Sequence, residues 1–116
     1  MQYLLLIYAN EAEMAARSPA DTQAITAEYA DFTKAIVQSG QFKGADRLKP
    51  TSTASTVRVR NGKVMTTDGP FAETREQLGG YYMIEAKNLD EAIAIAARIP
   101  GAKNGSIEVR PVWPMG

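Results

Sequence analysis

Apolar residues recur along this chain with two different periods, which predict where strands and helices form. The continuous apolar run at residues 3–8 is typical of a central strand that is buried on both faces. A helix is predicted next, beginning at the Ser18 cap with Pro19 in its first turn and ending at Ser39-Gly40. Its apolar stripe has the spacing of one helix face: Ile25, Tyr29, Phe32 and Ile36.

Residues 56–67 predict a β-hairpin, because two alternating segments flank the two-residue turn Asn61-Gly62. Pairing outward from the turn sets residue 60 opposite 63, 59 opposite 64, 58 opposite 65 and 57 opposite 66. One face, which we expect to join the core, then carries Val57, Val59, Val64 and Thr66. The other face carries Arg58, Arg60, Lys63 and Met65.

Three further segments are compatible with strands, at residues 41–46, 81–85 and 106–110. The polar residues 72–78 are compatible with a helical turn. In Gly79-Gly80, the absence of a side chain lets the backbone bend or approach another segment closely.

A second helix is predicted to begin at the Asn88 cap and to stop at Pro100-Gly101. We expect one of its faces to be apolar, with Leu89, Ala92, Ile93 and Ala96. The order strand, helix, strand, hairpin, strand, helix, strand then suggests two βαβ-like halves whose helices have similar lengths. Stacking both helices on one face of an antiparallel sheet gives an α+β fold, a ferredoxin-like two-layer sandwich. We expect a single domain over residues 1–116.

Composition narrows the possible chemistry. The chain has no Cys and no His, which excludes disulfides, a thiol nucleophile, an imidazole base and metal sites built from these residues. Its 13 basic and 13 acidic residues cancel, so we expect neither nucleic acid nor a membrane surface as a partner. No secretion signal is visible, and we expect a cytoplasmic protein.

The charge is unevenly distributed, since a cationic segment at residues 43–63 precedes an anionic one at residues 64–91. Two interpretations stay open. The two segments form separate solvated faces, or they meet in a cleft or in a contact between two copies of the chain.

Residues 67–82, Thr-Asp-Gly-Pro-Phe-Ala-Glu-Thr-Arg-Glu-Gln-Leu-Gly-Gly-Tyr-Tyr, resemble the signature of the DGPF branch of the YCII-related proteins. Residues 56–64 and 105–112 also resemble that branch, so the likeness covers nearly the whole chain. The resemblance implies bacterial origin and a ferredoxin-like fold that pairs through its sheets into a homodimer, a dimeric α/β barrel. It also implies a functional link to extracytoplasmic-function sigma factors, although no sigma-like segment is present here.

The family's YciI branch carries a His–Asp pair in a cleft, and this chain departs from that pattern because it has no His. Tyr29 stands in the neighbourhood that holds the His there. A His–Asp mechanism therefore does not transfer, and only an acidic partner such as Asp68 can persist. Arg75 stands where most similar chains of the branch carry Lys, which keeps the charge but changes the geometry of the donor.

Asp68 is the candidate catalytic residue, because it ends a strand and precedes the rigid Gly69-Pro70 turn. It either caps that turn through backbone N–H groups or acts as a general acid or base, provided that an apolar wall such as Phe71 desolvates it. Arg58 and Arg110 are candidate substrate-binding residues that can hold a carboxylate or phosphate; their alternative is a solvated face or an ion pair, for example with Glu108.

Tyr29 and Tyr81 offer phenols that can position a substrate, although core packing is the default for Tyr29. Glu73 joins the candidate substrate-binding residues. Glu73 and Glu76 lie three apart, but solvated acids are far commoner than metal ligands at that spacing, and we expect no metal and no cofactor.

Two functions follow from these residues. The first is a cofactor-independent enzyme that acts on a small anionic or aromatic molecule in a cleft of the dimer. The second is a small-molecule-binding or regulatory module, without catalysis, that is associated with sigma-factor signalling. A purely structural role for the motif stays open beside them.

Overall fold

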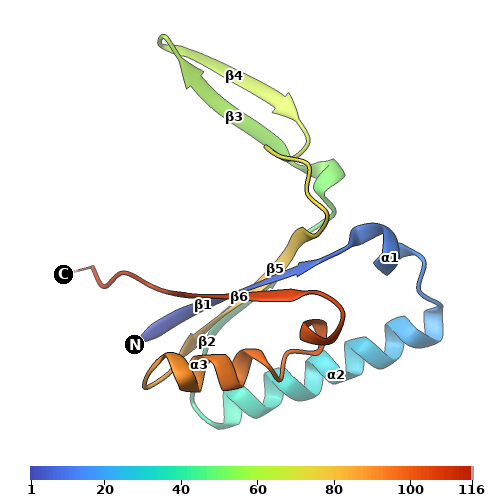
Figure 1. Ribbon diagram of the computed structural model, residues 1–116, viewed down its shortest axis with the longest axis vertical. Coiled ribbons are helices and arrows are strands. Elements are labelled where there is room, and N and C mark those ends of the chain that lie inside the picture. The colour runs from blue at the N-terminus through green and yellow to red at the C-terminus, as the bar shows by residue number, and fades with distance from the viewer. Residues whose placement is uncertain (116) are drawn as a thin grey trace.

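Four strands form one antiparallel sheet in the computed structural model, which describes residues 1–115. Their spatial order is β2-β5-β1-β6, and every neighbouring pair is antiparallel. The strands are β1 Gln2–Ala9, β2 Phe42–Arg47, β5 Gln77–Glu85 and β6 Ser106–Pro111. The structure is therefore α+β, and its strand order is consistent with the predicted ferredoxin-like arrangement (Figure 1).

Two helices, α2 Pro19–Gln38 and α3 Leu89–Ala96, cover one face of this sheet (Figure 1). Both predicted caps are confirmed, since the Ser18 hydroxyl accepts a 3.1 Å bond from the Asp21 N–H and the Asn88 side chain accepts a 2.9 Å bond from the Glu91 N–H. The prediction of similar helix lengths is wrong, because α2 has 20 residues and α3 has 8. Shorter helical segments are α1 Glu11–Ala15 and the 3₁₀ turns η1 Thr51–Thr53 and η2 Pro100–Lys103.

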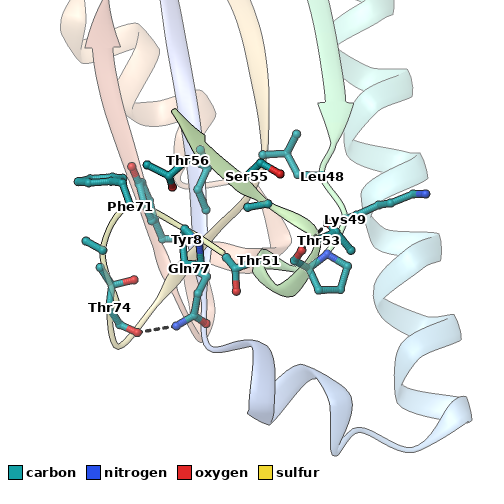
Figure 2. A pocket seen from close by; sticks show the side chains of 15 residues that line it. Tyr8, Leu48, Lys49, Thr51, Thr53, Ser55, Thr56, Phe71, Thr74 and Gln77 are labelled. Atoms are coloured by element: carbon teal, nitrogen blue, oxygen red, sulfur yellow. Dashed lines mark hydrogen bonds between the residues drawn. The ribbon is translucent and has the colours of Figure 1, made fainter. Parts of the chain in front are cut away.

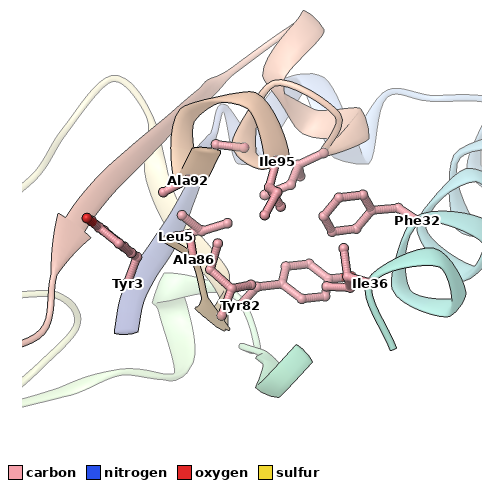
Figure 3. Packing of buried hydrophobic residues seen from close by; sticks show 11 residues of the cluster. Tyr3, Leu5, Phe32, Ile36, Tyr82, Ala86, Ala92 and Ile95 are labelled. Carbon is pink, nitrogen blue, oxygen red and sulfur yellow. The ribbon is translucent and has the colours of Figure 1, made fainter. Parts of the chain in front are cut away.

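The core lies between the helices and the sheet (Figure 3). Its fully buried side chains are Leu5, Ile36, Ile84 and Ile99. Phe32 of α2 meets Tyr82 of β5 edge to face, with ring centroids 5.1 Å apart, and the Tyr82 hydroxyl lies 2.7 Å from that of Thr33. This polar link satisfies a buried phenol and fixes α2 against β5.

The buried face of α3 differs from the predicted one. Of the four residues predicted to form its apolar face, Ala92 and Ala96 are buried, whereas Leu89 and Ile93 are each 48% exposed. The helix instead buries Ala92, Ile95 and Ala96, and together with Ile99 these positions follow the same helical spacing, rotated around the axis. Both stripes are apolar, so periodicity alone did not distinguish them.

The hairpin, formed by β3 Ser55–Arg60 and β4 Lys63–Asp68, is a separate two-stranded sheet. Its predicted register is confirmed, and Asn61 and Gly62 adopt the positive φ values, 53° and 76°, that the turn requires. The hairpin extends away from the four-stranded sheet and its helices, which we call the body (Figure 1). The prediction that its valine face joins the core is therefore wrong, since Val57 is 61% and Val64 is 70% exposed.

This extension enlarges the molecule. Its radius of gyration is 16.2 Å, against roughly 13 Å for a compact domain of this length.

The sheet face opposite the helices carries Leu4, Leu6, Tyr81 and Met83, and we call it the helix-free face. These residues are only partly buried. Within residues 1–115, β1 is therefore covered on one face alone, and the prediction that both of its faces are buried is wrong.

Two features of β5 position the site. The register between β1 and β5 shifts between Ile7 and Tyr8, because Ile7 pairs with Gly80 whereas Tyr8 pairs with Leu78. Gly80 is closely approached by β2: a Cβ atom there would lie 2.8 Å from the carbonyl oxygen of Asp46. β5 begins at Gln77, and the preceding residues form no helical turn, so that expectation is wrong.

Candidate functional site

A groove of about 720 Å³ lies at the base of the hairpin, where the hairpin leaves the ends of β1 and β5 (Figure 2). Three segments and one strand residue build it. Its lining residues are Tyr8, Leu48, Lys49, Pro50, Thr51, Thr53, Ala54, Ser55, Thr56, Pro70, Phe71, Ala72, Thr74, Gln77 and Leu78. Apolar side chains supply most of the wall and hydroxyl groups supply most of its polar atoms, a combination that suits a small organic molecule.

Glu11, the first residue of α1, fixes one side of the groove. Its carboxylate accepts a 2.9 Å bond from the Thr51 N–H and a second bond from the Thr51 hydroxyl. The Glu11 N–H donates to Gln77 Oε1 at 2.9 Å, and Gln77 Nε2 donates to the carbonyl of Thr74 (Figure 2). These bonds connect three lining segments through one acidic residue, so the polar side of the groove is held in place.

The turn after β4 forms another side. Gly69 has φ 99°; its N–H donates to the carbonyl of Ala54 at 2.7 Å, and its own carbonyl accepts a 2.9 Å bond from the Thr56 hydroxyl. Asp68 pairs with Ser55 across the hairpin, and its exposed carboxylate has no hydrogen bond within residues 1–115. Backbone and Thr56 therefore hold this turn. Phe71, which is 80% exposed, does not wall off Asp68.

Positive charge borders the groove. Lys49 lines it, and Arg47 and Lys49 both line a smaller adjoining cavity of about 290 Å³. Both cations are exposed, and the Lys49 side chain points away from the other lining residues (Figure 2). A carboxylate bound at this side of the groove would be their natural partner.

Two of the predicted substrate-binding residues lie on the helix-free face. The Tyr81 phenol donates a 2.6 Å bond to Asp46 Oδ2, and this bond, together with the charge of Asp46, raises the pKa of Tyr81 above 10.0. Arg110 forms an ion pair with Glu108 on the same strand, the acidic partner that the sequence suggested for it.

The other predicted residues lie elsewhere. Tyr29 packs against the core, where its phenol oxygen accepts a 3.1 Å bond from the Gly101 N–H; burial raises its pKa. Arg58 and Glu73 are exposed, on the hairpin and in the following loop. Within one chain the predicted residues therefore fall in three regions, and none of them lines the groove. Their functional roles stay predictions.

Sequence reasoning missed the groove residues. The sequence feature that could have indicated them is the run of small hydroxyl residues at 51–56, but such a run is also typical of an ordinary loop. Only the fold shows that it faces Gln77 and Tyr8.

No group of three or more acidic side chains that could hold a metal ion is present in residues 1–115. None of the helices in that range is both long and apolar enough to cross a membrane.

Comparison with known proteins agrees with the resemblance seen in the sequence. An uncharacterised protein of Rhizobium meliloti is 37% identical to this chain over 114 residues, which cover 97% of the chain and 92% of that protein. The family model described as the YCII-related domain matches residues 1–116. The chain therefore belongs to the YCII-related domain family.

Proposed function

We propose that this chain is a small-molecule-binding protein of the DGPF branch, which acts as a homodimer and takes an organic anion in the groove. The observation that carries this proposal is the groove itself, about 720 Å³ in volume, with apolar walls, a series of hydroxyl groups and Lys49. Sites for small ligands commonly have this size and this mixture of groups.

The chemistry of the lining indicates the class of ligand. Leu48, Pro50 and Leu78 favour an apolar or aromatic body. Thr53 and Ser55 offer hydroxyl groups that donate or accept. Lys49, with Arg47 beside it, favours a carboxylate at the end of the ligand.

The homodimer is supported by the helix-free face. Leu4, Leu6 and Met83 are partly buried and form an apolar strip along the centre of the sheet. A strand such as β1, apolar on both sides, is typical of a sheet covered on both faces. A second copy across this face would supply the missing layer and form the dimeric α/β barrel.

A cofactor-independent enzyme is the second candidate, favoured by the state of Asp68. Its carboxylate accepts no hydrogen bond within residues 1–115 and borders the groove through Ser55, whereas Glu11 is engaged with Thr51. An unengaged carboxylate can act on a substrate proton. Given a substrate, Asp68→Asn is expected to lower turnover at least tenfold, and an unchanged rate rejects this candidate. The link to sigma-factor signalling is an expectation that rests on the resemblance.

A thermal-shift screen tests the binding function. The probes are benzoate, phenylacetate and hexanoate, each compared with its uncharged amide. We expect the carboxylates to raise Tm and the amides to raise it less, with a stabilisation of about 2.7 kcal/mol at 100 times Kd.

Lys49→Gln is expected to weaken carboxylate binding at least tenfold, whereas Lys34→Gln, an exposed lysine of α2, leaves it unchanged. If no probe shifts Tm in the wild-type chain, or if Lys49→Gln binds as well as the wild type, the proposed anion site is wrong.

A further inference from the structure

The hairpin carries an apolar face that no part of residues 1–115 covers. Val57, Val59 and Val64 are 61%, 57% and 70% exposed, and the register places them on one side. A two-stranded hairpin without a covering layer is marginally stable in water. The turn Asn61-Gly62 nevertheless specifies this hairpin strongly. Such a combination is typical of a segment that finishes folding against a partner.

Charge indicates the partner. Residues 55–67 contain Arg58, Arg60 and Lys63 and no acidic residue. Because the whole chain is neutral, the remaining residues carry three more acidic than basic side chains. A hairpin with a charge of +3 and a remainder with a charge of −3 are complementary, and the two meet when the hairpin of one copy contacts the body of another.

We infer that the hairpin is an arm that packs its valine face on the body of a second copy of this chain, at the rim of the helix-free face; this rests on the homodimer proposed above. That rim carries Asp46 on β2 and Glu108 on β6, each on the same face as Leu6. The arm's apolar side thereby loses its exposure, while Arg58 and Arg60, on the opposite face of the hairpin, stay in solvent and attract these carboxylates only over a longer range.

Two other occupants fit less well. Contact between the valine faces of two hairpins would bring together two segments that each carry a charge of +3, and like charges across an interface are unfavourable. Nucleic acid would engage the cations but leave the valines in water. Proteins that bind DNA through its backbone commonly make about 6–10 phosphate contacts, more than three cations supply.

The arm and the groove share residues. Ser55 and Thr56 line the groove and are the first two residues of β3. Docking of the arm on the partner would therefore fix one wall of the groove, and the second copy would complete the binding site.

Sedimentation velocity on the full chain tests the arm. The double variant Val59→Thr/Val64→Thr keeps the shape and the β-branched character of both residues but makes them polar. We expect its dimer dissociation constant to rise at least tenfold. Val37→Thr, at an exposed valine of α2 (52%), is the matched control and should leave the constant unchanged. Arg58→Glu/Arg60→Glu should also weaken the dimer at least tenfold at low salt.

Met83→Glu, at the centre of the helix-free face, separates the arm from the homodimer itself. If Met83→Glu produces monomers while both arm variants dimerise like the wild type, the inferred docking of the arm is wrong and the proposed homodimer is retained. If the wild type is monomeric at every concentration, both are wrong, and binding of carboxylates in the groove is still decided by the thermal-shift screen.

Hydrogen exchange supplies a test without substitutions. We expect the amides of β3 and β4 to exchange more slowly as the protein concentration rises through the dissociation constant, together with amides of β2 and β6. Exchange of the arm that is independent of concentration rejects the inference. Binding to a 20-base-pair DNA duplex is a further test. The inference is rejected if the wild type binds the duplex and the Arg58→Glu/Arg60→Glu variant does not, although this variant still dimerises.

Discussion

The phenol of Tyr81 donates a 2.6 Å hydrogen bond to Oδ2 of Asp46, its cross-strand neighbour on β2. Ionising the phenol would break this bond and place two negative charges side by side, which is why the pKa of Tyr81 is raised above 10.0. The pair therefore holds its proton over the whole neutral range.

Tyr81→Phe is expected to remove a tyrosine that titrates above pH 10.0. Because the pKa is higher in the folded chain than in the unfolded one, the contribution of this proton to stability is complete below pH 10 and is lost as the pH rises further. The variant should therefore lose less stability above pH 10 than the wild type. Difference absorbance at 295 nm measures the titration of the tyrosines in the variant and the wild type. If the transition that the variant lacks lies below pH 10 in the wild type, the assignment is wrong.

Gly80→Ala is expected to destabilise the fold by about 1–3 kcal/mol. The added Cβ would lie 2.8 Å from the carbonyl oxygen of Asp46, and a backbone atom in a paired strand cannot easily move away. Gly79→Ala is the control, since nothing lies within 4 Å of its added Cβ. Urea unfolding of the two variants measures the difference, and equal losses would contradict the close approach of β2.

Ile36→Ala should cost about 2–5 kcal/mol, because Ile36 is fully buried in the core cluster between the helices and the sheet. Its neighbour Val37 is 52% exposed, so Val37→Ala is expected to change stability by less than about 0.5 kcal/mol. The comparison uses adjacent positions of one helix and is measured by thermal or urea unfolding. Similar losses at both positions would mean that α2 presents a different face to the sheet.

Tyr29→Phe is expected to cost about 1 kcal/mol, because the Gly101 N–H loses the phenol oxygen that accepts its hydrogen bond. Tyr8→Phe serves as the control, since its phenol makes no hydrogen bond within the described chain. If Tyr29→Phe is as stable as the wild type yet binds carboxylates more weakly, Tyr29 takes part in binding and its assignment to the core alone is wrong.

The hairpin shows how far sequence reasoning extends. Asn61-Gly62 and the alternation around it predict the strands and their register correctly, because these depend on local backbone geometry. The location of the valine face could not be predicted in the same way. An alternating strand has the same pattern whether its apolar side packs on its own core or projects from it.

The same limit applies to α3 and to the groove. Helix α3 has two apolar stripes, one with Leu89 and Ile93 and the other with Ile95. Which stripe is buried depends on how the helix packs on the sheet. The family signature marks the turn at Gly69-Pro70, and it therefore drew attention to Asp68, which lies beside the groove and does not line it. The lining residues Thr51 and Gln77 come together only through the tertiary contacts of Glu11.

The register shift between β1 and β5 makes the strand pairing at Gly79 part of the selectivity of the proposed binding site. Opposite residues of an antiparallel pair share a face, so Leu78 lies on the side of Tyr8, although strict alternation from Met83 would send it toward the helices. Without the shift, Gly79 would pair with Tyr8, Leu78 would face the helices, and Gln77 would take its place on the side of Tyr8, which would give the groove a hydrophilic floor. Relatives whose strands pair here without the shift should therefore select a different class of molecule even when every lining residue is conserved.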